Sequence, residues 1–250
     1  MQVPITHRLV VGGSGGIGLA FVRQFLAGDR SSQVIATYRR PSPALQALQR
    51  DYPERLQTLA LDITDEDQIA QMVVTLRETC PSLQTVVNAV GWLQEGGFSP
   101  EKSLRHLNAE QLQRYFLVNS IGPALLTKHL LPFFRHPQRS VFAHLSAKVG
   151  SIADNQLGGW YGYRASKAAL NMLIKTAAIE YQRYAPQAIL VCLHPGTTDT
   201  ELSKPFQRSV PPEKLFNSDR TVQQLLAVMD QLTPQDSGRF YSWDGTPLPW

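Results

Sequence analysis

The sequence contains little cysteine and no long apolar run. Its only cysteines, Cys80 and Cys192, lack metal-ligand spacing. We therefore expect structural thiols rather than a disulfide framework or a metal site. The longest apolar runs, such as Ile189 to Leu193, are far too short to span a bilayer. Since no apolar stretch of signal-peptide length precedes the first glycines, the sequence predicts a cytoplasmic protein without membrane contact.

Charge of either sign is also sparse. The chain has 24 Lys and Arg against 20 Asp and Glu, a formal net charge of +4, and 18% charged residues. No basic run with interleaved aromatic residues suggests a nucleic-acid surface, and the densest basic pair near a candidate site is Arg39-Arg40. We expect a small anionic ligand rather than a nucleic acid. The 250 residues suffice for one large α/β domain.

A glycine-rich turn stands between an expected strand and an expected helix near the N-terminus. The strand is His7–Val11, the apolar stripe of the helix begins at Ile17, and the turn reads GGSGGIG over residues 12–18. Glycines let backbone N–H groups approach a pyrophosphate at a helix N-terminus, so the turn predicts a phosphate cradle. It fits G-x-G-x-x-G from Gly13 and G-x-x-x-G-x-G from Gly12; a turn without a ligand is the alternative.

The second expected strand, Gln33–Tyr38, ends where a dinucleotide site distinguishes its cofactors. An NAD site usually places Asp or Glu there for the ribose 2′-hydroxyl. This chain has Arg39 and Arg40 instead, and a guanidinium can clamp a 2′-phosphate that a carboxylate would repel. The pair predicts NADP(H) rather than NAD(H). Two solvated loop arginines are the alternative.

Strand and helix patterns alternate along the whole chain. This order predicts a single-domain α/β Rossmann fold over 1–250, with a doubly wound seven-stranded parallel sheet and helices on both faces. Ligand chemistry should collect at the carboxyl ends of the strands. The later strands are expected at 56–61, 85–91, 140–145, 188–193 and 238–243, and helices at 41–52, 109–134 and 221–232, with another around Ile69–Leu76.

Three local features carry separate predictions. Thr64 is expected to cap the helix that contains Ile69. Pro123 is expected to kink the long helical stretch and leave the nearby Asn119 free for polar work. Residues 201–219, rich in Pro, Ser and charge, are predicted to form a substrate lid.

Tyr163 and Lys167 are four residues apart in a helical pattern. Side chains at this spacing lie one above the other on one helix face. An ammonium beside a phenol favours the phenolate, and each unit of pKa lowering requires about 1.4 kcal/mol. The pair is therefore a candidate for proton transfer. A solvated lysine beside a packed tyrosine is the alternative that this spacing leaves open.

In combination, these motifs resemble the short-chain dehydrogenase/reductase superfamily over nearly the whole chain. The spacing G-x-x-x-G-x-G is matched by Gly12, Gly16 and Gly18, and Y-x-x-x-K by Tyr163 and Lys167. The remaining matches are Asn88-Ala89-Val90-Gly91, Asn119 and Pro195-Gly196. Segments such as Gly150-Ser151-Ile152 and Trp243-Asp244-Gly245 most resemble the C-factor (C-signal) branch, which is related to small carbonyl reductases.

The resemblance implies hydride transfer between NADP(H) and a small-molecule carbonyl or secondary alcohol. Tyr163 would donate the proton, Lys167 would hold its pKa and bind the nicotinamide ribose, Asn119 would hold a water, and Ser146 would orient the substrate oxygen. Asp62 and Asn88 would meet the adenosine half, and Thr198 or Thr200 the carboxamide. The full implied cofactor set is Gly12, Ser14, Gly16, Ile17, Gly18, Arg39, Arg40, Asp62, Ile63, Asn88, Gly91, Tyr163, Lys167, Pro195, Gly196, Thr198 and Thr200. A homodimer or homotetramer is also implied.

One position departs from the family pattern. The catalytic serine usually stands three residues before the glycine matched by Gly150, but Ala147 is there. We expect Ser146 to replace it through a local backbone shift; Ser151, or a weaker oxyanion partner, is the alternative. Two other functions stay open: a cofactor-binding sensor or signalling protein with little turnover, and a structural role in which the dinucleotide stabilises a homo-oligomer. The retained Tyr163 and Lys167 favour an enzyme.

Overall fold

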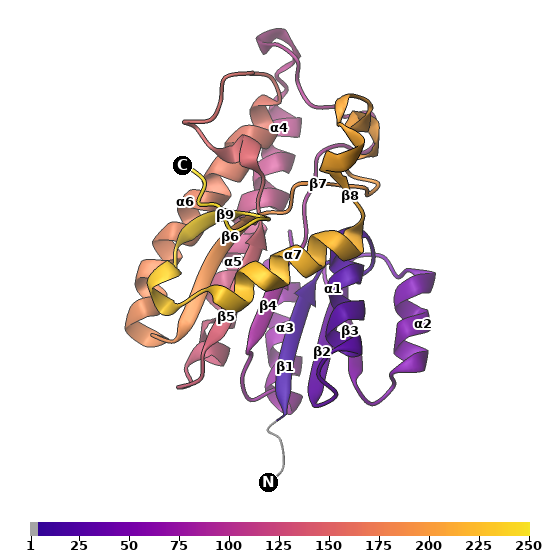
Figure 1. The fold of residues 1–250 in the computed structure, drawn as a ribbon, viewed down its shortest axis with the longest axis vertical. Coiled ribbons are helices and arrows are strands. Elements are labelled where there is room, and N and C mark those ends of the chain that lie inside the picture. Colours follow the sequence, from indigo (N-terminus) through magenta and orange to yellow (C-terminus); the bar gives the residue numbers. More distant parts are fainter. Residues whose placement is uncertain (1–4) are drawn as a thin grey trace.

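Seven parallel strands form the centre of the computed structural model, which describes residues 5–250 (Figure 1). Their order in the sheet is β3-β2-β1-β4-β5-β6-β9. From β1 the chain adds β2 and β3 on one side of the sheet, and β4 with the later strands on the other side. A crevice forms where the strand order reverses in this way, here between β1 and β4. The strands are β1 (Thr6–Val11), β2 (Ser32–Tyr38), β3 (Leu56–Ala60), β4 (Thr85–Asn88), β5 (Ser140–Leu145), β6 (Ala188–His194) and β9 (Arg239–Ser242).

Helices cover both faces of this sheet. One apolar core packs α1, α2 and α7 on one face, and the other packs α3, α4, α5 and α6 on the opposite face. The helices are α1 (Gly16–Ala27), α2 (Pro43–Asp51), α3 (Glu66–Thr79), α4 (Ala109–Phe116), α5 (Gly122–Leu130), α6 (Tyr161–Tyr184) and α7 (Ser218–Gln231). The predicted doubly wound Rossmann domain is confirmed.

The apolar pattern explains the layering. The central strands β5 and β6 are buried on both sides, so apolar residues predominate in them, as they do in parallel strands between two helix layers. The helices bury a single stripe each; in α3 this stripe is Ile69, Met72, Val73 and Leu76. Cys80 and Cys192 are buried free thiols, as predicted.

Short elements connect the main ones. A two-stranded parallel sheet, β7 (Thr197–Thr198) with β8 (Leu215–Phe216), was not predicted because two-residue strands leave no periodicity. The 3-10 helices are Leu104–His106, Leu131–Phe134, Lys148–Gly150, Lys204–Ser209, Pro212–Lys214 and Pro234–Asp236, and a π-helical turn spans Leu117–Ile121.

Two boundary predictions were wrong. Asp65, not Thr64, caps α3, because its carboxylate accepts the N–H groups of Asp67 and Gln68. In addition, β4 ends at Asn88 and not at residue 91. The predicted kink at Pro123 stays a prediction: Pro123 lies in the first turn of α5, which directly continues a π-helical turn, and such turns are a known cause of helix bends.

The segment predicted as a lid, 201–219, contains 3-10 helices, β8 and the start of α7, and several of its residues, among them Leu202 and Phe206, line the crevice. Within it, Phe206 packs edge-on against Trp160, with ring centroids 4.8 Å apart. Its movement stays a prediction. Within residues 5–250, every helix is too short or too polar to cross a bilayer.

Candidate active site

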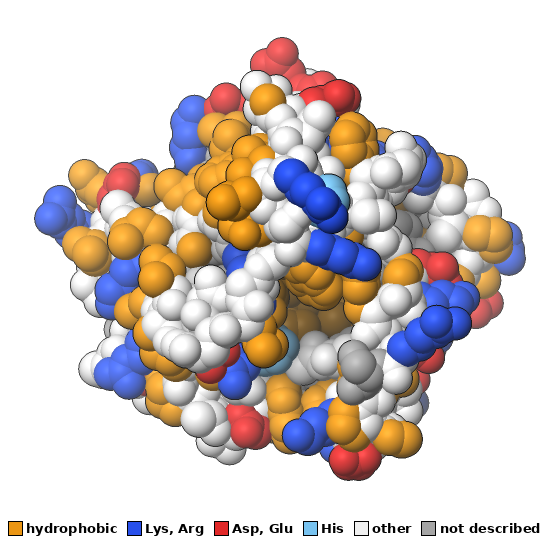
Figure 2. All heavy atoms as spheres, turned by 90° about the horizontal axis from the view of Figure 1, so that it is seen from above, with side chains coloured by type: hydrophobic (Ala, Val, Ile, Leu, Met, Phe, Trp, Pro, Cys, Tyr) orange, Lys and Arg blue, Asp and Glu red, His pale blue; other side chains and the backbone are white. Residues whose placement is uncertain are grey.

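The surface at the carboxyl ends of the strands is hollowed near its centre, and apolar side chains line the hollow (Figure 2). Three neighbouring cavities lie here. The Arg39 cavity, of about 270 Å³, shares Gly15 and the backbone after β4 with the Tyr163 cavity, of about 330 Å³. The Tyr163 cavity in turn shares Tyr163 and Ser146 with the Trp160 cavity, of about 490 Å³.

The glycine turn joins β1 to α1 at the floor of the first two cavities. Gly12 has φ +86°, and a Cβ there would lie 2.9 Å from Val90 Cγ2. A Cβ at Gly18 would collide with the Gly12 carbonyl oxygen, whereas at Gly15 it would meet open space. Among the described residues, no side chain caps α1 and no acidic residue occupies its first turn. This exposed, positive helix end fits a pyrophosphate.

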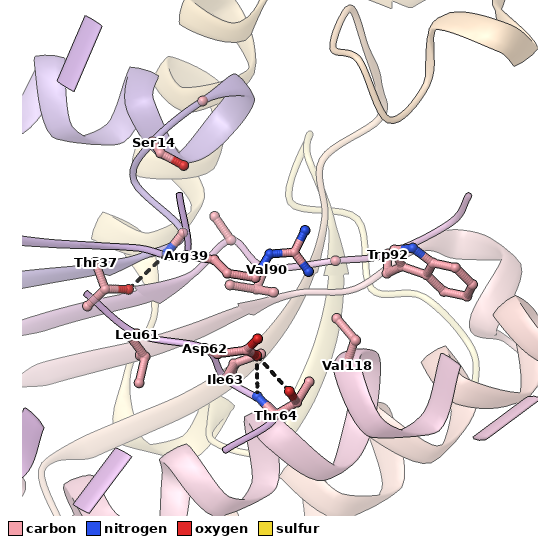
Figure 3. A pocket seen from close by; sticks show the side chains of 14 residues that line it. Ser14, Thr37, Arg39, Leu61, Asp62, Ile63, Thr64, Val90, Trp92 and Val118 are labelled. Atoms are coloured by element: carbon pink, nitrogen blue, oxygen red, sulfur yellow. Dashed lines mark hydrogen bonds between the residues drawn. The ribbon is translucent and has the colours of Figure 1, made fainter. Parts of the chain in front are cut away.

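The Arg39 cavity has a mixed polar and apolar lining and lies beside the ends of β2 and β3 (Figure 3). Thr37 Oγ1 accepts the Gly12 N–H at 3.2 Å and fixes the turn against β2. Asp62 Oδ1 accepts the N–H and the hydroxyl of Thr64 at 2.9 and 2.6 Å. Burial acts to raise the pKa of Asp62, but these hydrogen bonds and the charge of Arg39 outweigh it and lower the pKa. Asp62 is therefore an acceptor at neutral pH.

The two arginines after β2 share an acidic partner. Arg39 Nη2 lies 3.4 Å from Glu95 Oε1, and Arg40 Nη1 lies 3.5 Å from the same oxygen. All three side chains are at least 41% exposed, so these ion pairs are weak and exchangeable. Their guanidinium groups could bind a phosphate once Glu95 gives way.

Helix α6 carries Tyr163 and Lys167 into the Tyr163 cavity as one buried pair. Lys167 Nζ donates to the Leu145 carbonyl oxygen at 2.9 Å and lies 5.9 Å from the Tyr163 ring centroid. Burial lowers the pKa of Lys167 to about 8 and raises the pKa of Tyr163, which also lies near Tyr115. The spacing predicted a lowered tyrosine pKa, but within the protein alone the cost of desolvating a phenolate dominates.

Asn119 lies in the π-helical turn, where its fully buried amide clamps the chain after β4. Its Oδ1 accepts the Trp92 N–H at 2.8 Å, and its Nδ2 donates to the Trp92 carbonyl oxygen at 2.9 Å. The same Nδ2 also donates to Ser166 Oγ on α6 at 3.1 Å. Asn119 therefore holds the wall of the cavity in place.

The three candidates for the serine position have different surroundings. Ser146 lines both the Tyr163 and Trp160 cavities, and its Oγ donates to Asn171 Oδ1 on α6 at 2.7 Å. Ala147 lines the Trp160 cavity without a hydroxyl. Ser151 is buried outside the residues that line the three cavities, and its Oγ accepts the Asp154 N–H.

A polar network lies beneath the cavities, between β4, β5 and α5. Asn88 accepts the Val90 N–H through Oδ1, and its Nδ2 lies 3.4 Å from His144 Nδ1. The other ring nitrogen of His144 lies 3.3 Å from Thr127 Oγ1. Complete burial, and secondarily the charge of Lys167, lowers the pKa of His144 to about 3. His144 is therefore neutral and structural at pH 7.

Most of the predicted residues meet at these cavities. Those lining them are Gly12, Ser14, Gly16, Ile17, Arg39, Asp62, Ile63, Gly91, Ser146, Tyr163, Lys167, Pro195, Gly196, Thr198 and Thr200. Gly18, Arg40, Asn88 and Asn119 lie outside the lining and act on it through neighbours. Prediction missed Thr37, Trp92, Glu95, Asn171 and His194; of these only Asn171 left a signal, four residues after Lys167 on the same helix face.

Known proteins match this arrangement. Residues 6–210 match the short chain dehydrogenase family. The C-signal protein of Myxococcus xanthus is 34% identical over 149 residues, which cover 59% of this chain and 84% of that protein. A benzil reductase of Saccharomyces cerevisiae, which forms (S)-benzoin, is 31% identical over 82% of this chain and 76% of its own length.

Solved structures agree over the whole fold. The NADPH-bound carbonyl reductase from chicken fatty liver superposes with a TM-score of 0.86 at 27% identity, covering 99% of this chain and 100% of that one. The sequence match, the parallel sheet and the paired Tyr163 and Lys167 at its crevice lead to one conclusion. The chain belongs to the short-chain dehydrogenase family of oxidoreductases.

Proposed function

We propose that the protein is an NADP(H)-dependent reductase of small-molecule carbonyl compounds. One observation carries this proposal: the Tyr163 cavity is lined both by the glycine turn, through Gly15 and Gly16, and by Tyr163 and Lys167. A phosphate cradle and an acid–base pair thus open into the same space. A hydride acceptor placed there would have the phenol beside its oxygen.

The chain's own residues fit an extended dinucleotide. The α1 N-terminus would hold the pyrophosphate, Asp62 and the backbone after β4 would line the adenosine half, and Arg39 with Arg40 would bind a 2′-phosphate. The open space at Gly15 and the guanidinium at the Arg39 cavity support this fit. The nicotinamide of such a cofactor supplies or accepts the hydride.

Tyr163 would handle the proton. In reduction the substrate carbon gains a hydride while its oxygen gains the Tyr163 proton, which yields an alcohol and leaves a phenolate. The raised pKa keeps the phenol protonated at neutral pH, which suits a proton donor. The Lys167 ammonium, held by the Leu145 carbonyl, would stabilise the phenolate until solvent returns the proton.

The Trp160 cavity would receive the substrate. Its walls are largely apolar and include Leu93, Val149, Trp160 and Phe206. Aromatic walls favour flat, apolar carbonyl compounds over sugars or short hydroxy acids. The benzil reductase relative makes benzil, an aromatic diketone, the natural first probe.

The test is NADPH oxidation at 340 nm with benzil and a panel of aromatic ketones and aldehydes. We expect turnover by the wild type and a loss of roughly 10²–10⁴-fold in kcat for Tyr163→Phe, since the proton donor is removed. NADPH binding, followed by its fluorescence, should stay within about two-fold because the phenol ring is retained.

Tyr161→Phe is the matched control, because Tyr161 lies on the same helix outside the residues lining these cavities. Equal inactivity of the wild type and Tyr163→Phe, with tight NADPH binding in both, would refute the enzyme and favour the cofactor-binding sensor. The C-signal relative and Ala147 make that the second candidate.

A further inference from the structure

The proposed reductase has an incomplete set of donors for its substrate oxygen. Ala147 has no hydroxyl, and the Ser146 hydroxyl proton is directed to Asn171 Oδ1 on the side of α6. Tyr163 transfers its own proton during the reaction, so a second donor is needed to bind the oxygen as negative charge develops on it. Another N–H or O–H at the same strand ends would complete the set.

His194 stands beside Ser146 on the neighbouring strand. The parallel ladder pairs Leu145 with Leu193, and the Ser146 N–H donates to the Leu193 carbonyl oxygen at 2.8 Å. His194 is therefore the next residue across the ladder, and adjacent strands lie about 4.8 Å apart. It lines the Trp160 cavity together with Tyr163, Ser146 and Ala147. No other residue of β6 lines that cavity.

One nitrogen of the His194 imidazole lacks a hydrogen-bond partner within residues 5–250; this nitrogen is the buried Nδ1. A buried polar nitrogen without a partner costs free energy, and such exceptions call for an explanation. The enclosed Nδ1 has no acceptor for a proton in the described part of the chain, so the ring proton is better placed on Nε2, from which it can be donated to a ligand in the cavity.

Charged side chains of both signs lie around His194. Lys148 lies on the cavity side and forms an ion pair with Asp154 at 3.3 Å, while Asp244 approaches from the end of β9. Burial is the main cause that lowers the pKa of His194 to about 4, with Lys148 acting in the same direction and both aspartates opposing it. At neutral pH the ring is thus uncharged and carries a single N–H donor.

We propose that His194 donates a hydrogen bond to the substrate carbonyl oxygen and so takes the place that Ala147 leaves empty. This inference rests on the proposed reductase function. His194 keeps its proton throughout: the oxygen receives the proton of Tyr163, the carbon receives the hydride, and the imidazole N–H only stabilises the developing charge. The neutral ring suits this role, because an imidazolium would compete with Tyr163 as the acid.

The test is a double-mutant cycle at positions 194 and 147. Loss of one oxyanion donor lowers kcat by about 10²–10³-fold, and we expect this for His194→Ala with benzil and NADPH. His194→Gln, whose amide keeps a donor, should lose less. In the His194→Ala background, Ala147→Ser should restore at least about ten-fold, because it returns a hydroxyl to the same oxygen. A purely structural histidine would not be rescued by a serine in the loop after β5.

Two measurements separate a chemical effect from a folding effect. NADPH fluorescence and thermal unfolding are recorded for every variant, and NADPH affinity should stay within about two-fold of wild type. If His194→Ala does not fold, the same rescue is measured in the His194→Gln background, where Ala147→Ser should again raise kcat.

Several results would overturn the inference while leaving the reductase intact. These are a wild-type kcat in His194→Ala, no rescue by Ala147→Ser, or a larger loss in Ser146→Ala than in His194→Ala. A wild type that binds NADPH and reduces no carbonyl on the panel would instead refute the proposed function itself.

Discussion

The two ends of the cleft are built in opposite ways. At the Arg39 end the side chains of Arg39, Arg40 and Glu95 are 41 to 77% exposed and pair with one another. At the Tyr163 end Lys167, Ser146 and Tyr163 are 3%, 4% and 8% exposed and are fixed by packing and by bonds to the fold. Exposed ion pairs exchange easily and are screened by salt, whereas buried polar groups must keep their partners.

Substitutions at the two ends should therefore have different effects. A substitution at the Arg39 end should alter cofactor preference with little effect on stability. A substitution at or below the Tyr163 end should alter stability together with function, because each buried group is held by another. Substitutions at each end test this difference.

The largest effect is expected beneath the buried end, at His144. Its pKa is about 3 in the folded protein and near 6.5 when unfolded, so the unfolded chain binds the extra proton. Stability from the neutral ring is therefore full above pH 6.5 and falls as pH drops toward 3, by up to about 1.4 kcal/mol per pH unit. His144→Gln should remove this contribution and flatten the urea-unfolding free energy between pH 6.5 and 4.

The matched control is His129→Gln, since His129 is only partly buried and contacts the exposed Glu66. The variant at His144 should also be less stable at pH 7, because Asn88 or Thr127 loses a partner. An unchanged slope in acid would mean that His144 is not the buried group that titrates, and His194 would then carry the acid sensitivity.

A smaller effect, confined to binding, is expected at the exposed end. Replacing Arg39 and Arg40 together by Ala should weaken NADPH about 10- to 100-fold, because hydrogen bonds to charged groups contribute about 1.5–3 kcal/mol. NADH affinity and the melting temperature should stay near wild type. Fluorescence titration of both cofactors checks this, with the exposed Arg50→Ala as control. Equal losses for the two cofactors would rule out a 2′-phosphate site.

The fold and many of the residues that line the cavities could be predicted from the sequence, for identifiable reasons. Strands such as β6 are continuous apolar runs, and Tyr163 and Lys167 share a helix face at a spacing that any helix imposes. It was harder to predict which of two adjacent side chains caps a helix. Asp65 caps α3 in place of Thr64 because its carboxylate accepts two N–H groups.

Contacts across the fold could not be predicted at all. Glu95 meets Arg39 only because the loop after β4 folds back over β2, and His194 meets Ser146 only through the register of β5 and β6. The direction of the Tyr163 pKa also depends on burial, which no spacing shows. These are tertiary effects, and they decide how the site is tuned.

The smallest effect is expected at Glu95, at the exposed end. The Glu95 carboxylate forms ion pairs with both arginines, so a 2′-phosphate would have to displace it. Exposed pairs contribute about 0.2–1 kcal/mol, and Glu95→Gln should therefore tighten NADPH by only about two- to five-fold. NADH, which has no 2′-phosphate, should not respond, and the gain should shrink as salt screens the pairs. Glu110→Gln, in the same surface region on α4, is the control. If Glu95→Gln instead weakened NADPH, the carboxylate would be orienting the guanidinium groups for the phosphate, and the exposed end would be as preorganised as the buried one.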